Sequence, residues 1–205
     1  MKLTDIREQL SPEMQELSSK LLQLANAAGQ TLRKSTEVAQ ELAKDPFTEP
    51  TKQQATVAEL LIILLHTCDR IASVAFQTTV AEQTATTLHM SFMTALVGAT
   101  IPAFVQAACP DEDEEEQEET QADLLHLYNT RAIQYGFFPL SSGKTEHEHE
   151  PLLTLGGIRL AEALECPENA EVTLHGIEII INALATLRTK LPLKEAIGKL
   201  IAGAS

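Results

Sequence analysis

The pattern of apolar and polar positions along the chain is typical of helices. In the first patterned segment, five apolar residues recur every three or four positions, which places them on one helix face: Leu17, Leu21, Leu24, Ala28 and Leu32. Ser11 and Pro12 precede this segment as a capping residue and a proline at the first helical position. Pro46 and Pro50 follow the end of the pattern. We therefore predict a first helix from Pro12 to about Ala43.

Six further helices follow, separated by prolines, a glycine and one acidic segment. They are predicted over residues 51–81, 84–108, 118–135, 152–165, 168–190 and 193–202. Pro102 is expected to kink or shorten the third helix, and Gly136 closes the fourth. The sequence contains no long alternation of apolar and polar residues and no Asn-Gly or Asp-Gly turn that would indicate strands. We predict an all-α multi-helix bundle of six or seven helices, in a single helical domain over residues 1–205.

One segment is almost wholly acidic. Residues 111–119 hold eight Asp or Glu in nine positions, and such a run repels itself and buries no apolar surface. We predict a solvated acidic loop at 110–118 that leads into a helix, because acidic residues suit a helix amino terminus. A long connection is predicted at 136–151. The acidic loop either docks on a basic partner, mimics nucleic-acid charge, or serves only to keep the loop in solvent, and we favour the last role.

The formal net charge is −14, from 15 Lys and Arg against 29 Asp and Glu. This balance argues against binding to nucleic acid or to an anionic membrane through bulk charge. Subtracting the eight acidic charges of residues 111–119 from −14 leaves only −6 for the rest of the chain. Aromatic residues make up 4% and Trp is missing, which also argues against surfaces that stack on bases or sugars.

The stretch from Gln83 to Pro110 contains no Asp, Glu, Lys or Arg, so it must be weighed as a membrane span. Its length satisfies the requirement of ~20 residues. However, Thr94 and Thr100 dilute its apolar character, Pro102 interrupts it, and no Lys/Arg cluster or Tyr/Trp belt flanks it. We therefore expect a buried central helix and no membrane partner.

The three cysteines and the amino terminus indicate a cytoplasmic protein. Cys68, Cys109 and Cys166 are odd in number and far apart, which fits reduced thiols better than a disulfide framework. Residues 1–8 mix both charges and lack the apolar core of a secretory signal.

The chain carries no complete sequence motif of the common enzyme classes. Residues 142–145, SGKT, match only the end of a phosphate-binding loop, because Phe138 occupies the position of its first glycine. A phosphotransfer histidine needs a nearby cation; His89 has none within two turns, and Asp69 beside His66 opposes a phosphoryl group. The sequence has no GxSxG, HExxH, GxGxxG or EF-hand pattern. These observations lower the expectation of an enzyme.

Three predicted helices each carry a histidine three residues before an oxygen-bearing side chain. The pairs are His66 with Asp69, His126 with Asn129, and His175 with Glu178. Residues three apart share a helix face, and metal sites in bundles combine imidazole and carboxylate groups from several helices. No cofactor is expected by default, but a divalent metal would find its candidate ligands here: His66, Asp69, His126, His175 and Glu178.

The same residues also fit two polar stripes, which usually face water. One stripe consists of Glu59, His66, Asp69, Ser73 and Gln77, and the other consists of Glu171, His175, Glu178 and Asn182. We favour solvent-facing stripes over a metal site, and buried hydrogen bonding is the remaining alternative.

Four other polar residues stand among apolar neighbours and are candidates for ligand binding: Asp69, Arg70, Asn129 and Arg131. An arginine in such a setting is usually paired with a carboxylate. A bridge from Arg131 to Asp69 across two helices is therefore a specific structural hypothesis.

The leading functional hypothesis is a non-catalytic helical protein that binds another protein or associates with itself. It rests on the near-continuous apolar surface of residues 57–108 and 172–187, which needs more cover than one small chain supplies. A homodimer would supply it. The alternative is a helical bundle that binds a metal or a small ligand, with or without enzyme activity. This alternative requires His66, His126 and His175 to converge on one cavity.

Overall fold

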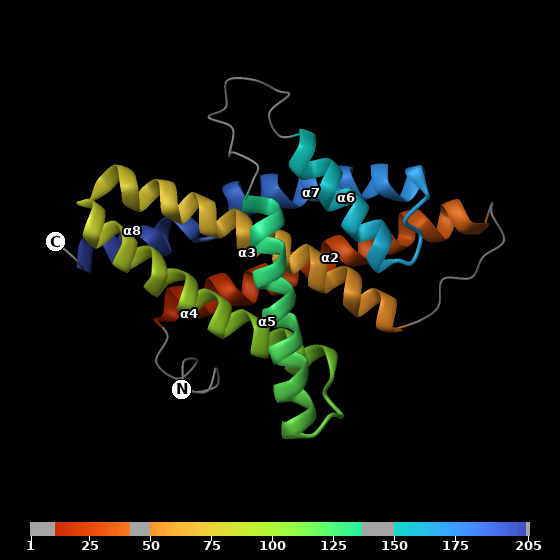
Figure 1. Ribbon diagram of the computed structural model, residues 1–205, viewed down its shortest axis with the longest axis horizontal. Helices are drawn as coiled ribbons and strands as arrows, with labels where there is room; N and C mark the ends of the chain where they lie inside the picture. The colour runs from red at the N-terminus through yellow and green to blue at the C-terminus, as the bar shows by residue number, and fades with distance from the viewer. Residues whose placement is uncertain (1–10, 42–49, 137–149, 204–205) are drawn as a thin grey trace.

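The computed structural model describes residues 11–41, 50–136 and 150–203, and these residues form seven α-helices and no strand. The helices are α2 (Pro12–Glu41), α3 (Pro50–Thr79), α4 (Glu82–Ala108), α5 (Glu114–Gly136), α6 (Glu150–Ala163), α7 (Ala170–Lys190) and α8 (Leu193–Gly203) (Figure 1). The predicted all-α multi-helix bundle is confirmed. Except for α5, each helix begins and ends within two residues of its predicted bounds.

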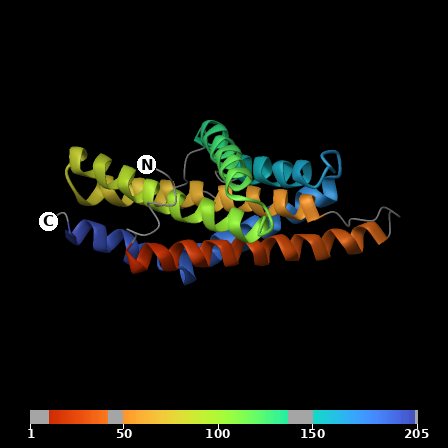
Figure 2. The same ribbon diagram turned by 90° about the horizontal axis from the view of Figure 1, so that it is seen from below.

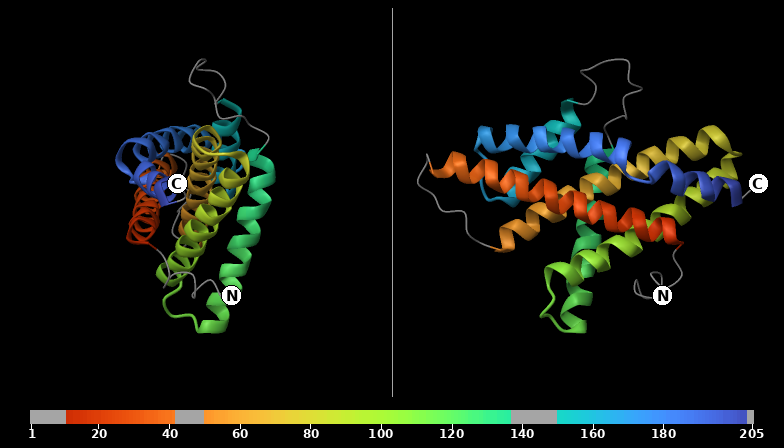
Figure 3. Two further views of the ribbon diagram at one scale, coloured as in Figure 1. Left: turned by 90° about the vertical axis from the view of Figure 1, so that its left-hand side faces the viewer. Right: turned by 180° about the vertical axis from the view of Figure 1, so that it is seen from behind.

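Helix α3 lies at the centre of the bundle and contacts each of the other six helices. Residues 56–68 within it are all buried, as is typical of a mostly apolar helix that neighbours surround on all sides. Helices α2, α7 and α8 lie on one side of the pair formed by α3 and α4, and α5 lies on the opposite side (Figures 2 and 3). Helix α6 packs beside α3 and α7.

The predicted apolar face of α2 is confirmed. Four of its five residues are fully or almost fully buried, and Leu24 is half-buried. The Ser11 hydroxyl accepts a hydrogen bond from the backbone N–H of Met14 (3.4 Å), which satisfies one of the free donors of the first turn.

Helix α4 is the buried helix that the uncharged stretch predicted. It continues through Pro102 to Ala108, so the proline does not shorten it. Its polar residue Thr100 is fully buried; the hydroxyl donates to the Leu96 carbonyl (2.6 Å) and lies 3.1 Å from the Ser18 hydroxyl. These hydrogen bonds within the helix and to α2 make a buried hydroxyl tolerable.

Two helices, α4 and α7, are long and apolar enough to cross a membrane by length and composition. In α4, 61% of the most apolar window is buried inside the bundle, whereas in α7 only 33% is. A buried helix of a globular core passes the same test.

The expected acidic loop at 110–118 is wrong from residue 114 onward, because α5 begins at Glu114. The Asp113 carboxylate accepts hydrogen bonds from the backbone N–H groups of Glu115 and Glu116, both at 3.0 Å. In return, the Glu116 carboxylate accepts from the backbone N–H of Asp113 (3.2 Å). This reciprocal capping box starts the helix inside the acidic segment, where negative charge favours a helix amino terminus. The predicted connection at 136–151 is shorter at both ends, because α5 ends at Gly136 and α6 begins at Glu150. Its remaining residues, 137–149, which include the SGKT segment, lie outside the described residues.

Helices α6 and α7 cross at closely approaching backbones. A Cβ atom on Gly157 would lie 2.7 Å from the Thr173 carbonyl oxygen, and one on Gly176 would lie 3.3 Å from the Cα of Gly157. Only glycine fits at such a crossing. This contact fixes one face of α7 against the bundle.

Candidate functional site

A buried ion pair joins α3 to α5. The Arg131 guanidinium donates from Nε to both carboxylate oxygens of Glu59 (3.1 and 3.2 Å) and from Nη2 to Oε1 (2.5 Å). The two side chains are only 12% and 7% exposed. Burial disfavours the charged form of Arg131, but the hydrogen bonds and charge of Glu59 outweigh this effect and raise the pKa of Arg131. Arg131 therefore stays charged, and its hydrogen bonds to Glu59 join α5 to α3.

The ion pair continues into a polar network that reaches α6. The side-chain oxygen of Gln134 accepts from Arg131 Nη1 (3.0 Å) and from Arg159 Nη2 (3.3 Å). Arg159 Nη1 in turn donates to Glu162 (2.5 Å). Two cations thus share one amide oxygen, and each also has a carboxylate of its own, which balances the charge of the network.

His66 forms the second contact between α3 and α5. Its ring stacks on Tyr128 with centroids 4.4 Å apart and meets Tyr135 edge-on at 5.5 Å. Nε2 lies 3.1 Å from the Tyr128 carbonyl oxygen, and because a carbonyl only accepts, Nε2 carries the proton. Burial lowers the pKa of His66 to about 4, although the Tyr128 carbonyl and Asp69 favour the cation. His66 is therefore a neutral packing residue.

The predicted bridge from Arg131 to Asp69 is wrong. Arg131 pairs with Glu59, and Asp69 accepts from His89 Nε2 (2.7 Å) on the neighbouring helix α4. The expectation that the first polar stripe faces water is also wrong for its first half. Glu59 and His66 are buried, because α5 crosses α3 over these residues, and only Gln77 at the far end is fully exposed.

His89 of this pair lines a pocket of about 440 Å³, together with Ser73 and Thr86. A histidine oriented by a carboxylate is the arrangement that general bases use. However, the Ser73 hydroxyl receives its hydrogen bond from Gln77 (3.3 Å), and within the described ranges no hydrogen bond joins Ser73 to His89. The pair therefore connects α3 to α4 and lacks an aligned nucleophile.

The candidate metal ligands do not converge. His66 is buried under α5, His126 is exposed on α5, and His175 lies on α7, between Glu171 and Glu178 at 3.8 and 4.0 Å. Helices α5 and α7 lie on opposite sides of α3 (Figure 3). Across residues 11–41, 50–136 and 150–203, no three His, Cys, Asp or Glu side chains are close enough to hold a metal ion.

The four candidate ligand-binding residues are also spread out. Asp69 and Arg70 are half-buried on α3, Asn129 is exposed on α5, and Arg131 is committed to Glu59. One signal in the sequence points to the true partner: Glu59 is the single charged residue in the otherwise apolar run 57–65. A carboxylate buried in such a run requires a cation.

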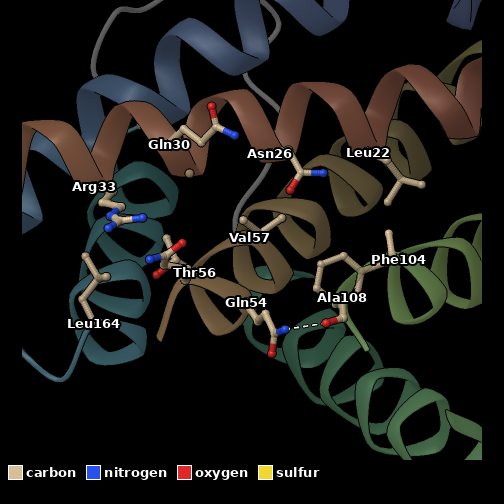
Figure 4. Close-up of a pocket in the computed structure, with 13 residues that line it drawn as sticks. Leu22, Asn26, Gln30, Arg33, Gln54, Thr56, Val57, Phe104, Ala108 and Leu164 are labelled. Atoms are coloured by element: carbon tan, nitrogen blue, oxygen red, sulfur yellow. Dashed lines mark hydrogen bonds between the residues drawn. The ribbon is translucent and has the colours of Figure 1, made fainter. Parts of the chain in front are cut away.

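A pocket of about 330 Å³ opens between α2, α3 and the carboxyl end of α4 (Figure 4). Its apolar lining consists of Leu22, Gly29, Val57, Phe104, Ala107, Ala108 and Leu164. Its polar lining consists of Asn26, Gln30, Arg33, Gln53, Gln54 and Thr56. No sequence pattern indicated this pocket, because its walls come from segments far apart in the chain.

The outer face of α7 is a further candidate site. Leu174 and Ile181 are 65% and 48% exposed, and seven residues, two helical turns, separate them, so they share one face. Among the described residues these are two of only six large apolar side chains that the bundle leaves exposed, and the other four lie on four different helices: Val74, Met90, Ile133 and Ile158. The outer face of α7 therefore carries more exposed large apolar residues than any other helix.

Comparison with protein-family models, with curated proteins and with solved structures finds no significant match to this chain.

Proposed function

We propose that the protein acts without catalysis, through protein–protein contact on the outer face of α7, and that its partner is a second copy of the same chain. The observation that carries the proposal is the exposure of this apolar helix: only 33% of its most apolar window is buried. Apolar patches that a monomer leaves exposed commonly mark interaction surfaces.

The exposed face of α7 has the spacing of a helix–helix seam. Six exposed residues alternate three and four positions apart and define the α7 stripe: Glu171, Leu174, Glu178, Ile181, Ala185 and Arg188. This spacing keeps a straight row of side chains toward a partner helix over about 25 Å.

The α7 stripe is complementary to itself when two copies of α7 run antiparallel. Glu171 then faces Arg188 of the second copy, Leu174 faces Ala185, and Glu178 faces Ile181. Two-fold symmetry repeats each contact. The ends of the stripe thus attract one another, whereas a parallel pair would place like charges together.

Glu178 weakens this interface. Its carboxylate lies in the middle of the stripe against an apolar side chain, where docking would remove part of its hydration. A single helix pair also buries less surface than a standard interface. We therefore expect a dimer that dissociates at micromolar concentration, on the order of 1–100 μM.

The first test is the change Ile181→Glu, which places a charge in the apolar centre of the stripe. We expect this variant to sediment as a monomer of 22.3 kDa at concentrations where the wild-type protein sediments at twice that mass. Met90→Glu is the matched control, because Met90 is 65% exposed on α4, outside the stripe; it should leave the dimer intact. A wild-type protein that is monomeric at all concentrations up to about 1 mM would overturn the proposal.

Charge reversal tests the antiparallel direction. Glu171→Arg and Arg188→Glu should each weaken the dimer about tenfold, and the double variant should restore it, because only an antiparallel pair brings these residues together. Glu178→Leu should tighten the dimer at least about tenfold by removing the buried carboxylate. A double variant as weak as the single ones would show that the two helices do not pair in this direction.

A further inference from the structure

We infer that the pocket between α2, α3 and α4 binds a small uncharged carboxamide, with its apolar body against the inner wall and its amide at Asn26 and Thr56. The pocket and the α7 stripe share no residues, so this inference goes beyond the proposed function and does not rest on it.

The inner wall of the pocket is apolar. It is formed by residues of α2, α3, α4 and the turn after α6: Leu22, Val57, Phe104, Ala107 and Leu164. The volume of about 330 Å³ lies at the small end of the range for ligand pockets, roughly 300–1,000 Å³. Such a space suits a single ring with a short substituent.

The charges around the pocket disfavour a charged ligand. The described residues that line it include no Asp or Glu, and their one charged residue, Arg33, already has an interaction partner. A charged ligand would therefore lose hydration in the pocket without gaining an opposite charge of its own. The groups left to recognise a ligand are neutral.

Two of these neutral groups complement a carboxamide. Asn26 projects from α2 toward α3 (Figure 4), and no hydrogen bond joins its side-chain amide to another described residue. Thr56 on α3 is only 2% exposed, and its hydroxyl donates to the Lys52 carbonyl (2.7 Å), so its oxygen can still accept a hydrogen bond. A carboxamide offers a carbonyl acceptor for the Asn26 N–H and an N–H donor for the Thr56 oxygen.

Close contacts between the helices hold the walls of the pocket in position. Gln54 Nε2 donates to the Ala108 carbonyl (2.6 Å), which joins α3 to the end of α4. On the other side, Gly29 brings α2 close to α3, because a Cβ atom there would lie 2.7 Å from Cγ2 of Val57. The cavity is therefore formed before a ligand enters, which reduces the entropy lost on binding.

Calorimetric titration of the full chain with hydrocinnamamide, a phenyl ring joined to a carboxamide by two methylene groups, tests the inference. We expect saturable binding of one molecule per chain, with a dissociation constant below about 1 mM. Hydrocinnamate and hydrocinnamamidine have nearly the same shape but carry a negative and a positive charge, so each should bind at least about tenfold more weakly. Benzylacetone, in which a methyl group replaces the amide nitrogen, should bind about threefold or more weakly.

Two changes locate the ligand. Asn26→Leu should weaken hydrocinnamamide binding about fivefold or more by removing the amide that pairs with it. As the matched control, Gln23→Leu removes an amide from an exposed residue of α2 outside the pocket and should change binding less than about twofold. Ala107→Phe should abolish binding by filling the cavity, while circular dichroism shows unchanged helix content, because Ala107 is exposed at the rim.

Several results would overturn the inference. One is the lack of saturable hydrocinnamamide binding at about 1 mM. Others are binding of hydrocinnamate, hydrocinnamamidine or benzylacetone that is as tight as that of the amide, an equal effect of the Asn26 and Gln23 changes, or full binding by the Ala107→Phe variant. Titrating the Ile181→Glu variant as well separates these results from any failure of the dimer proposal.

Discussion

Helices α4 and α7 share an apolar composition, but their surroundings in the bundle differ. Both are long and apolar, but α4 is 61% buried over its most apolar window and α7 only 33%. Helix α4 contacts α2, α3, α5 and α8, whereas α7 packs on α2, α3 and α6 and leaves its outer face open. Apolar helices are stabilised when neighbouring helices cover them, and within the described residues this cover is more extensive for α4 than for α7.

The cover of α4 depends partly on α5, a helix that polar contacts hold in place. Leu124 and Tyr135 are buried on α5, and the Glu59–Arg131 ion pair and the His66–Tyr128 stack also link this helix to α3. No comparable helix covers the α7 stripe in the part of the chain that the structure describes.

Loss of Arg131 should have the largest effect. Arg131→Met leaves the Glu59 carboxylate buried without its cation, and this should cost about 3–5 kcal/mol of unfolding free energy. Urea unfolding should be followed in the Ile181→Glu background, so that self-association does not contribute. Arg188→Met, an exposed arginine on α7, is the control and should change stability by less than about 0.5 kcal/mol.

The double variant Glu59→Leu/Arg131→Met sharpens this test. Because no charge is left buried, most of the lost stability should return. A loss below about 1 kcal/mol in Arg131→Met alone would show that the ion pair does not hold α5.

Truncation of equivalent leucines compares the two apolar helices directly. Leu96 on α4 is fully buried, so Leu96→Ala should cost about 2–5 kcal/mol through lost transfer energy and a cavity. Leu174 on α7 is 65% exposed, so Leu174→Ala should cost less than about 0.5 kcal/mol in a monomeric background. Equal losses at the two positions would contradict the contrast between α4 and α7.

Acid should weaken the packing of α5 against α3 and α4 before it affects α7. The pKa of His66 is about 4 in the folded protein against 6.5 in the unfolded chain, so the unfolded chain takes up the proton first. The stability that neutral His66 contributes is therefore complete above pH 6.5 and is lost as pH falls toward 4, to a total of about 3 kcal/mol. His66→Phe, which keeps the stack on Tyr128, should not show this loss.

The readout for His66 is the difference in unfolding free energy between the two proteins from pH 7 to pH 4, combined with hydrogen exchange. The protection factors of the α5 amides should fall in the wild-type protein at low pH and not in His66→Phe, while the protection factors of the α7 amides should not change. A constant difference across this range would show that His66 does not titrate on unfolding.

Much of the fold could be predicted from the sequence because helix signals are local. Prolines and apolar spacing located the helix ends, and only the start of α5 was misplaced, since the capping box of Asp113 and Glu116 lies inside a run expected to stay in solvent. The partners of polar residues could not be predicted. The spacing placed Glu59, His66 and Asp69 on one face of the helix. It could not show that α5 crosses this face at Glu59, so that Arg131 pairs with Glu59 and not with Asp69.

The sequence by itself determined that the chain forms apolar helices and that two of them require cover, because periodicity and helix-capping signals act within a few residues. Only the tertiary structure decided which helix is covered, which carboxylate meets Arg131, and where a pocket remains. These features depend on how helices distant in sequence cross one another. Residues on one helix share a face through local geometry alone, whereas contacts between helices depend on the packing of the whole bundle.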